Sequence, residues 1–219
     1  QKEKLFGPPE QKVEVRVVCW KSEGVRSKSG GITDLLIDAM EKAASQDSSY
    51  PSLFKLIEER HLELIKSFIP INMQSGLISF VKVEINRLET LLDGVAMLQE
   101  ITPKTTDKVS SFGERLSAKI IEAIFLENNL DTRLLDGHDL IQTAQQNGRL
   151  IINWEKTKEN VTRLYNSSSA KITLVPGFVA RNEKGENTTL GRGGSDFTAS
   201  ILANILNASS IEIWTDVSG

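Results

Sequence analysis

The segment Thr188–Asp196 combines residue types that can bind an anion. It reads Thr-Thr-Leu-Gly-Arg-Gly-Gly-Ser-Asp, with three glycines within four residues, and an apolar helical pattern follows it. Glycines let the backbone approach a ligand closely and adopt positive φ angles, and the free N–H groups at a helix start favour an anion. The guanidinium of Arg192 can hold a carboxylate or phosphate through two parallel hydrogen bonds. The pattern predicts a carboxylate- or phosphate-binding loop.

A tight turn capped by Ser195 would also explain the glycines, because a glycine-rich match alone is weak evidence. Asp196 would stabilise the helix start through the helix dipole by about 0.3–1 kcal/mol without any other role. The arginine inside the glycines, together with an aspartate at the helix start, favours the functional interpretation.

Other polar residues have equally ordinary explanations when each is taken alone. Thr33 is suited to cap a helix over Asp34–Ala44. Glu114 falls on a helix whose surface would be charged in any case. His61 lies on an apolar helical stripe, and we expect it to pack there without binding a ligand.

Composition excludes several classes of protein. The chain has 219 residues and carries 26 Lys and Arg against 29 Asp and Glu, a net charge of −3, which argues against a general nucleic-acid binder. Its single cysteine cannot form an intrachain disulfide and offers no zinc-binding spacing. No stretch approaches the roughly 18–20 apolar residues of a membrane span, and the polar start lacks a signal-peptide core. We therefore expect a cytoplasmic protein without membrane or nucleic-acid partners.

The elements that must position these residues indicate an α/β fold. Apolar residues recur at helical spacing over most of the region between residues 32 and 124. A further helix is expected from Ser195 to Leu206. Strand patterns occur at Val15–Cys19, Asp131–Leu135, Leu150–Ile152, Lys171–Val175, Val179–Arg181, Thr188–Leu190 and Ile211–Trp214.

From these patterns we expect a mainly parallel central sheet flanked by helices on both faces, with a β-hairpin and a long helical insertion. The strands Val15–Cys19, Lys171–Val175 and Ile211–Trp214 should share that sheet. The hairpin should be Val179–Arg181 with Thr188–Leu190, around a polar turn that contains glycine.

The sequence resembles the aspartate kinases, of the amino-acid kinase superfamily. The resemblance rests on five segments in order and covers about residues 29–219: Gly30–Leu36, Ser111–Ser117, Leu174–Phe178, Thr189–Asp196 and Glu212–Val217. Related amino-acid kinases share the fold but lack the long helical stretch between the first two segments. The resemblance implies the amino-acid kinase fold and transfer of the ATP γ-phosphoryl group to the side-chain carboxylate of L-aspartate, which gives 4-phospho-L-aspartate.

The resemblance also implies roles for individual residues. Arg192 and Asp196 would be catalytic. The substrate amino acid would be bound by Thr33, Glu114, Arg192 and Ser29, with Glu114 on its ammonium and Arg192 on a carboxylate. ATP would be bound by Gly193, Gly194, Ser195, Thr215 and Asp216. The cofactors would be ATP and Mg²⁺, and no protein ligand of the metal is assigned. Arg192, Glu114 and Thr33 should converge on one cleft.

The start of the chain departs from the family pattern. Lys4–Pro9 reads Lys-Leu-Phe-Gly-Pro-Pro where aspartate kinases have Lys-Phe-Gly-Gly-Thr-Ser, and proline supplies no N–H to a phosphate. This leaves two alternatives open: a catalytically inactive amino-acid-binding or regulatory module, or another amino-acid kinase superfamily member. We expect one domain over 1–219 that is incomplete at both ends and lacks regulatory domains. The full-length protein is expected to be a homo-oligomer, which could also carry a homoserine dehydrogenase.

Overall fold

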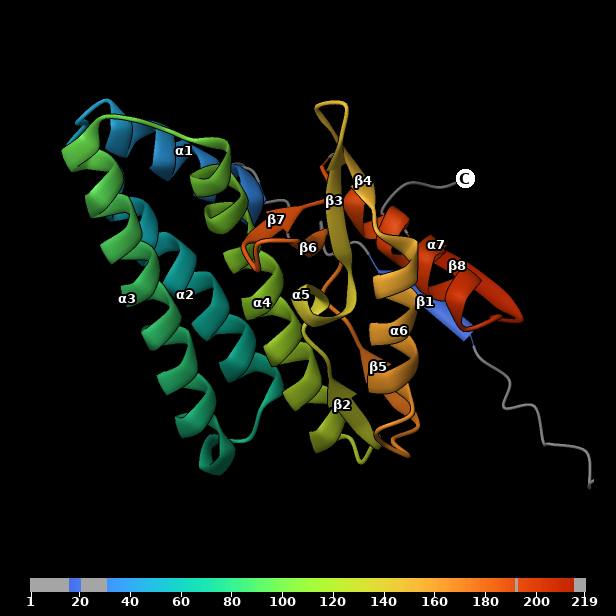
Figure 1. Ribbon diagram of the computed structural model, residues 1–219. Helices are drawn as coiled ribbons and strands as arrows, with labels where there is room; N and C mark the ends of the chain where they lie inside the picture. The colour runs from blue at the N-terminus through green and yellow to red at the C-terminus, as the bar shows by residue number, and fades with distance from the viewer. Residues whose placement is uncertain (1–15, 21–30, 192, 215–219) are drawn as a thin grey trace, which may run out of the picture.

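Four long helices form one side of the molecule (Figure 1). The computed structural model describes residues 16–20, 31–191 and 193–214. The four helices are α1 (Ile32–Ala44), α2 (Tyr50–Phe68), α3 (Gln74–Leu98) and α4 (Pro103–Glu127), with a 3-10 turn at Ile71–Met73 between α2 and α3. They confirm the long helical region expected from the apolar spacing.

The apolar stripes of these helices meet in one core. Its fully buried side chains include Leu36, Ile57, Leu88, Leu92 and Leu116. Burying one such side chain stabilises the fold by about 1.5–3 kcal/mol. The interhelical packing therefore holds α4 in place, and α4 carries Glu114.

The other side of the molecule is built from short strands and three helices (Figure 1). The strands are β1 (Arg16–Trp20), β2 (Thr132–Leu134), β3 (Gln142–Gln146), β4 (Arg149–Ile152), β5 (Ile172–Leu174), β6 (Val179–Asn182), β7 (Asn187–Thr189) and β8 (Ser210–Trp214). The helices are α5 (Gly137–Leu140), α6 (Trp154–Tyr165) and α7 (Gly194–Ile205). A second core joins them, centred on Leu140, Ile141, Val161, Ala180 and Ile201.

Among the described residues the strands form three hydrogen-bonded sheets. β1 pairs with β8 in parallel, with Arg16 opposite Ser210 and Trp20 opposite Trp214. β2 pairs with β5 in parallel. The third sheet has four strands in the order β4-β3-β6-β7. It is mixed, because β3 runs parallel to β6 while the outer pairs are antiparallel.

The α/β class, the parallel pairing and the β6–β7 hairpin are confirmed. The finer expectation that Lys171–Val175 and Ile211–Trp214 lie in one sheet is wrong for the described residues, since β5 and β8 belong to separate sheets. Apolar character marks a segment as a strand but does not say which strand lies beside it.

Three elements differ from the expected ones. β3 is rich in glutamine and α6 is largely polar, so neither shows a strong apolar pattern, and neither was predicted. Helix α1 begins at Ile32, so Thr33 lies inside its first turn and is not its cap. Gly31 is the N-cap residue, and the Asp34 carboxylate accepts a hydrogen bond from the Gly31 N–H at 3.1 Å.

Within the part of the chain that the structure describes, no helix is both long enough and apolar enough to cross a membrane.

Candidate functional site

The glycine-rich turn before α7 has the backbone conformation of an anion-binding helix start. Gly191 and Gly193 adopt φ angles of 71° and 76°, a region that favours glycine. The N–H of Gly194 donates to the carbonyl of Gly191 at 3.0 Å and so closes the turn. Ser195 comes next, at a position whose N–H group has no acceptor within a helix. Such an N–H group at a helix start favours an anion.

A second turn, Pro176–Phe178, packs against this helix start. A side-chain carbon on Gly194 would lie 2.9 Å from Cδ2 of Phe178, so only a glycine fits there without a shift. The N–H of Phe178 donates to Oγ1 of Thr198 at 3.0 Å, and the Thr198 hydroxyl donates to the carbonyl of Gly194 at 2.8 Å. The Leu174–Phe178 segment of the sequence resemblance therefore packs directly on the glycine-rich turn.

Two carboxylates on α4 accept hydrogen bonds from strand residues, and a third lies on nearly the same helix face. Asp107 accepts hydrogen bonds from Thr188 and Thr189 of β7. Glu122 accepts one from the N–H of Leu134 on β2 at 3.0 Å. Glu114 lies seven residues after Asp107, which is almost two whole helical turns, so it projects from nearly the same face of α4.

Glu114 is half-buried, and none of the described residues gives its carboxylate a hydrogen bond or an ion pair. Burial raises the pKa of Glu114, because it disfavours the charged form. A half-buried carboxylate without a partner is suited to bind a cationic group of a ligand, such as an ammonium.

Helix α1 starts beside Gly113 of α4. A side-chain carbon on Gly113 would lie 3.2 Å from Cγ2 of Ile32 and 3.4 Å from Cδ1 of Leu36, so α1 and α4 are in close contact here. Thr33 and Glu114 each follow a residue of this contact, Ile32 and Gly113. The helices that carry Thr33 and Glu114 therefore touch one residue before each of them, and the meeting of these two side chains in one cleft stays a prediction.

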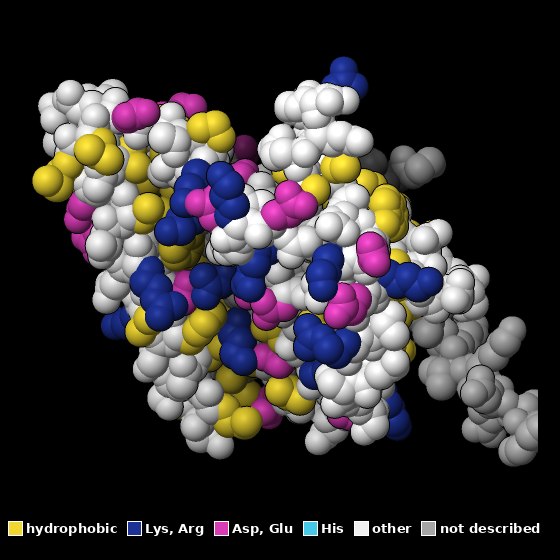
Figure 2. Space-filling view, in the orientation of Figure 1, with side chains coloured by type: hydrophobic (Ala, Val, Ile, Leu, Met, Phe, Trp, Pro, Cys, Tyr) yellow, Lys and Arg dark blue, Asp and Glu magenta, His cyan; other side chains and the backbone are white. Residues whose placement is uncertain are grey.

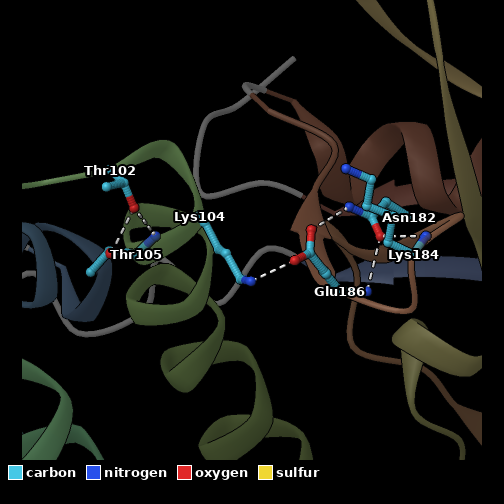
Figure 3. A network of polar contacts seen from close by, with 6 residues as sticks. All are labelled: Thr102, Lys104, Thr105, Asn182, Lys184 and Glu186. Atoms are coloured by element: carbon cyan, nitrogen blue, oxygen red, sulfur yellow. Dashed lines mark hydrogen bonds and ion pairs between the residues drawn. The ribbon is translucent and has the colours of Figure 1, made fainter.

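Strand β7 runs along α4 toward Glu114. The ion pair Lys104–Glu186, 2.5 Å between Nζ and Oε1, joins the first turn of α4 to the residue before β7 (Figure 3). One turn further along α4, Asp107 meets the end of β7 at Thr188 and Thr189. The two contacts follow the same order along both chains, so β7 runs parallel to this part of α4 and points along it toward Glu114.

At Arg115, the residue after Glu114, an ion pair joins α4 to a buried carboxylate on α3. Glu84 is only 1% exposed, and its carboxylate contacts Arg115 at 3.2 Å and Arg87 at 2.6 Å. Near this pair, the hydrogen bond from His138 lowers the pKa of Asp136, and the charge of Arg115 acts in the same direction. His61 packs in the helical core as expected, with Nδ1 2.7 Å from the carbonyl of Ile57.

The predicted site residues fall into two groups. Thr33, Glu114, Gly193, Gly194, Ser195 and Asp196 lie in the described structure. Ser29, Arg192, Thr215 and Asp216 lie outside the described residues, as do Lys4–Pro9. The convergence of Thr33, Glu114 and Arg192 on one cleft therefore stays a prediction.

Sequence reasoning missed Asp107. The available signal was its spacing of seven residues from Glu114, which places both on one helix face, but a carboxylate on a charged helix looks like an ordinary surface residue. Its hydrogen bonds cross 81 and 82 residues of sequence, and no local pattern announces them.

The charges on the face shown in Figure 2 are mixed. Lys and Arg side chains alternate with Asp and Glu side chains over the area of α4 and α6. No group of three or more His, Cys, Asp or Glu among the described residues could hold a metal ion.

Comparison with known proteins gives a consistent assignment. The Amino acid kinase family matches residues 25–219. The aspartokinase of Schizosaccharomyces pombe is 30% identical, over 94% of this chain and 40% of its own length. The bifunctional aspartokinase/homoserine dehydrogenase 1, chloroplastic, of Arabidopsis thaliana is 27% identical, over 97% of this chain and 24% of its own. The chain thus spans well under half the length of these relatives.

A solved structure agrees with the sequence matches. The E. coli aspartokinase III in complex with aspartate and ADP superimposes with a TM-score of 0.75 at 26% identity, over 86% of this chain and 41% of that one. The resemblance to aspartate kinases noted in the sequence is confirmed.

Proposed function

Because the chain belongs to the amino acid kinase family, we propose that it is the catalytic part of an aspartate kinase. A side-chain carboxylate oxygen of L-aspartate attacks the γ-phosphorus of ATP. The bond from that phosphorus to the β–γ bridging oxygen breaks, and ADP leaves with its electron pair. The products are 4-phospho-L-aspartate and ADP. This reaction supplies the first intermediate for the synthesis of lysine, threonine and methionine.

One observation carries the proposal: the half-buried carboxylate of Glu114 receives no hydrogen bond or ion pair from the described residues, and it lies on the helix that Asp107 joins to the strand before the glycine-rich turn. An amino acid held between them would place its ammonium on Glu114 and leave a carboxylate for Arg192. Thr33, at the adjacent start of α1, would add a hydroxyl. The relatives named aspartokinase, and the neighbour that holds aspartate and ADP, support this choice of substrate.

Phosphoryl transfer depends mainly on positioning and on stabilising charge. The N–H group of Ser195 at the start of α7 suits a phosphoryl oxygen. The space beside Gly193 is open, because a side-chain carbon there would meet no atom within 4 Å. Thr215 and Asp216 follow β8 and would contact the nucleotide. Gly194 would shape the turn.

Mg²⁺ would arrive with ATP. It ordinarily keeps several waters and binds substrate phosphates with one or two carboxylates, so a complete protein cage is not required. Asp196, in the first turn of α7, is the carboxylate nearest in sequence to the glycine-rich turn. When bound, the ion would neutralise phosphate charge.

The single-domain organisation over 1–219, a homo-oligomeric full-length protein and a cytoplasmic location belong to the same proposal. The Arabidopsis relative is named as chloroplastic, so imaging of the tagged full-length protein is needed to test the location.

A substrate panel tests the proposed function. ADP production by the full-length protein should require L-aspartate and should not occur with L-glutamate, N-acetyl-L-glutamate or carbamate. ADP production with one of these other substrates would assign the chain to a different amino-acid kinase. Binding of L-aspartate in calorimetry without ADP production would favour the inactive module.

A further inference from the structure

We propose that Asp107 is a positioning residue of this site, which fixes the segment leading to Arg192 against the helix that carries Glu114. The proposal rests on the proposed function for its effect on catalysis. Its structural part, that Asp107 holds the end of β7 on α4, stands on the contacts alone.

The contact is bidentate and joins distant parts of the chain. The Thr188 hydroxyl donates to Oδ2 of Asp107 at 3.0 Å, and the Thr189 hydroxyl donates to Oδ1 at 2.6 Å. Thr189 is buried and Asp107 is half-buried, so water has limited access to these bonds. One carboxylate thereby takes the hydroxyls of two successive strand residues, which fixes both the position and the rotation of the strand end.

The contact is close along the chain to both residues that are expected to bind the substrate amino acid. Arg192 comes three residues after Thr189, at most about 11 Å of chain. Glu114 comes seven residues after Asp107, about 10.5 Å along the helix. The Asp107 contact therefore joins the two chain segments that carry Arg192 and Glu114, within a short length of chain of each.

The Lys104–Glu186 ion pair connects the same two elements but has a different character. Its side chains are 59% and 37% exposed, and Glu186 is also held by Asn182, which donates to Oε2 at 3.0 Å (Figure 3). It lies at the turn of the hairpin, farther from the glycine-rich turn than Asp107. An exposed ion pair of this kind contributes little, so Lys104 provides a matched control.

Loss of the Asp107 contact should change the binding of one substrate selectively. If the strand end moves on α4, the spacing between Arg192 and Glu114 changes, and the amino acid that spans them binds less well. The nucleotide groups expected after β8 are not tied to Asp107. Those expected at Gly193, Gly194 and Ser195 are held separately, because the Pro176–Phe178 turn packs against the start of α7. We therefore expect the KM for L-aspartate to rise, while the KM for Mg-ATP stays the same.

The test compares four variants of the full-length protein: Asp107→Ala, Asp107→Asn, the double variant Thr188→Val/Thr189→Val, and the control Lys104→Ala. Asp107→Ala should raise the KM for L-aspartate at least tenfold and change the KM for Mg-ATP less than twofold. Asp107→Asn should recover part of the loss, because an amide can still accept one hydroxyl hydrogen bond. Lys104→Ala should behave as the wild type.

The valine double variant identifies the partners. It should reproduce the Asp107→Ala defect, and combining it with Asp107→Ala should add less than a further twofold change. Independent, multiplying effects would overturn the proposal, as would an equal rise in both KM values or a defect in Lys104→Ala as large as that in Asp107→Ala.

A readout without activity separates this proposal from the proposed function. Amide hydrogen exchange of residues 187–190 should accelerate at least tenfold in Asp107→Ala and stay unchanged in Lys104→Ala. If the wild type makes no phosphoaspartate, the proposed function fails, and this exchange result alone decides the structural role of Asp107. Unchanged exchange in Asp107→Ala would overturn that role whatever the activity.

Discussion

A side-chain carbon on Gly177 would lie 2.9 Å from the Cα atom of Ser195. The backbone of the Pro176–Phe178 turn thus touches the backbone at the start of α7. A flexible side chain could move away from such a contact, but here two main chains meet. The start of α7 is consequently held by the shape of a separate turn as well as by its own glycines.

We predict that Gly177→Ala displaces the start of α7. The added carbon forces the two backbones apart, and overpacking of this kind costs about 1–3 kcal/mol. The loss of kcat/KM for L-aspartate should exceed what the fall in Tm explains at the assay temperature. Thermal unfolding and steady-state kinetics on the same preparations measure both quantities.

Gly94→Ala is the matched control for that substitution. Gly94 lies within α3, and a side-chain carbon there would meet no atom within 4 Å. Alanine is favoured over glycine inside a helix by about 0.5–1 kcal/mol, so this variant should be more stable and equally active. A Gly177→Ala protein that is as active and stable as Gly94→Ala would contradict the described packing.

Glu114→Gln should stabilise the protein at neutral pH while weakening its binding of aspartate. Burial raises the pKa of Glu114. A carboxyl whose folded-state pKa is raised binds its proton more tightly when folded, so its relative stability is full at low pH and is lost as pH rises through that pKa. The wild type should therefore match Glu114→Gln below the pKa of unfolded glutamate, about 4.3, and be less stable than the variant above the folded-state pKa.

Urea unfolding of both proteins from pH 4 to pH 8 measures this difference. In activity, losing a charged partner worth about 1.5–3 kcal/mol should lower kcat/KM for L-aspartate about 10–100-fold. A variant that is destabilised at pH 7, or that keeps full activity, would remove Glu114 from the substrate site.

The free energy of unfolding should depend on the ion pair between Arg115 and the buried carboxylate of Glu84. Arg115→Met removes one of its two cationic partners and should lower the free energy of unfolding by about 1–3 kcal/mol. Adding Glu84→Gln should recover part of this loss, because the buried charge is then gone. The exposed pair Lys55–Glu59, 3.9 Å apart, offers the control Lys55→Ala, with a change below about 0.5 kcal/mol. Equal costs for the single and double variants would contradict a buried charge pair.

The sequence revealed most about elements with regular apolar spacing. Leu77, Val81, Ile85, Leu88 and Leu92 recur along α3 and are all buried, so this helix was predicted from its residues. β3 reads Gln-Thr-Ala-Gln-Gln and gains its place through pairing with β4 and β6, which no local pattern encodes. Helix α6 was missed because only Thr157 and Val161 of its residues are buried.

The site residues also differ in how far local sequence patterns predict them. The glycines before α7 and the start of α1 follow local rules of backbone conformation, so they were recognisable. The convergence of Thr33 with Glu114 is expected only from the family resemblance, since their sequence separation carries no signal of contact. Asp107 was not recognisable, because its role depends on a strand that packs against α4 from 81 residues away.

Arg192→Ala should reduce kcat/KM for L-aspartate by 10–100-fold or more, since hydrogen bonds to charged groups are worth about 1.5–3 kcal/mol. Arg192→Lys should restore only part of the activity, because a point charge cannot replace a planar fork. Thr33→Ser keeps the hydroxyl on the first turn of α1 and should be nearly silent. Full recovery with lysine would show that Arg192 does not hold a carboxylate in two-point contact.

The most direct test of the proposed function is to trap the acyl phosphate. The full-length protein is incubated with L-aspartate, Mg-ATP and hydroxylamine, and aspartyl hydroxamate is quantified against ADP. We predict equal amounts of both products in the wild type, and at least a tenfold lower rate of both in Arg192→Ala. A wild-type protein that binds L-aspartate but forms no hydroxamate would contradict the assignment as an aspartate kinase.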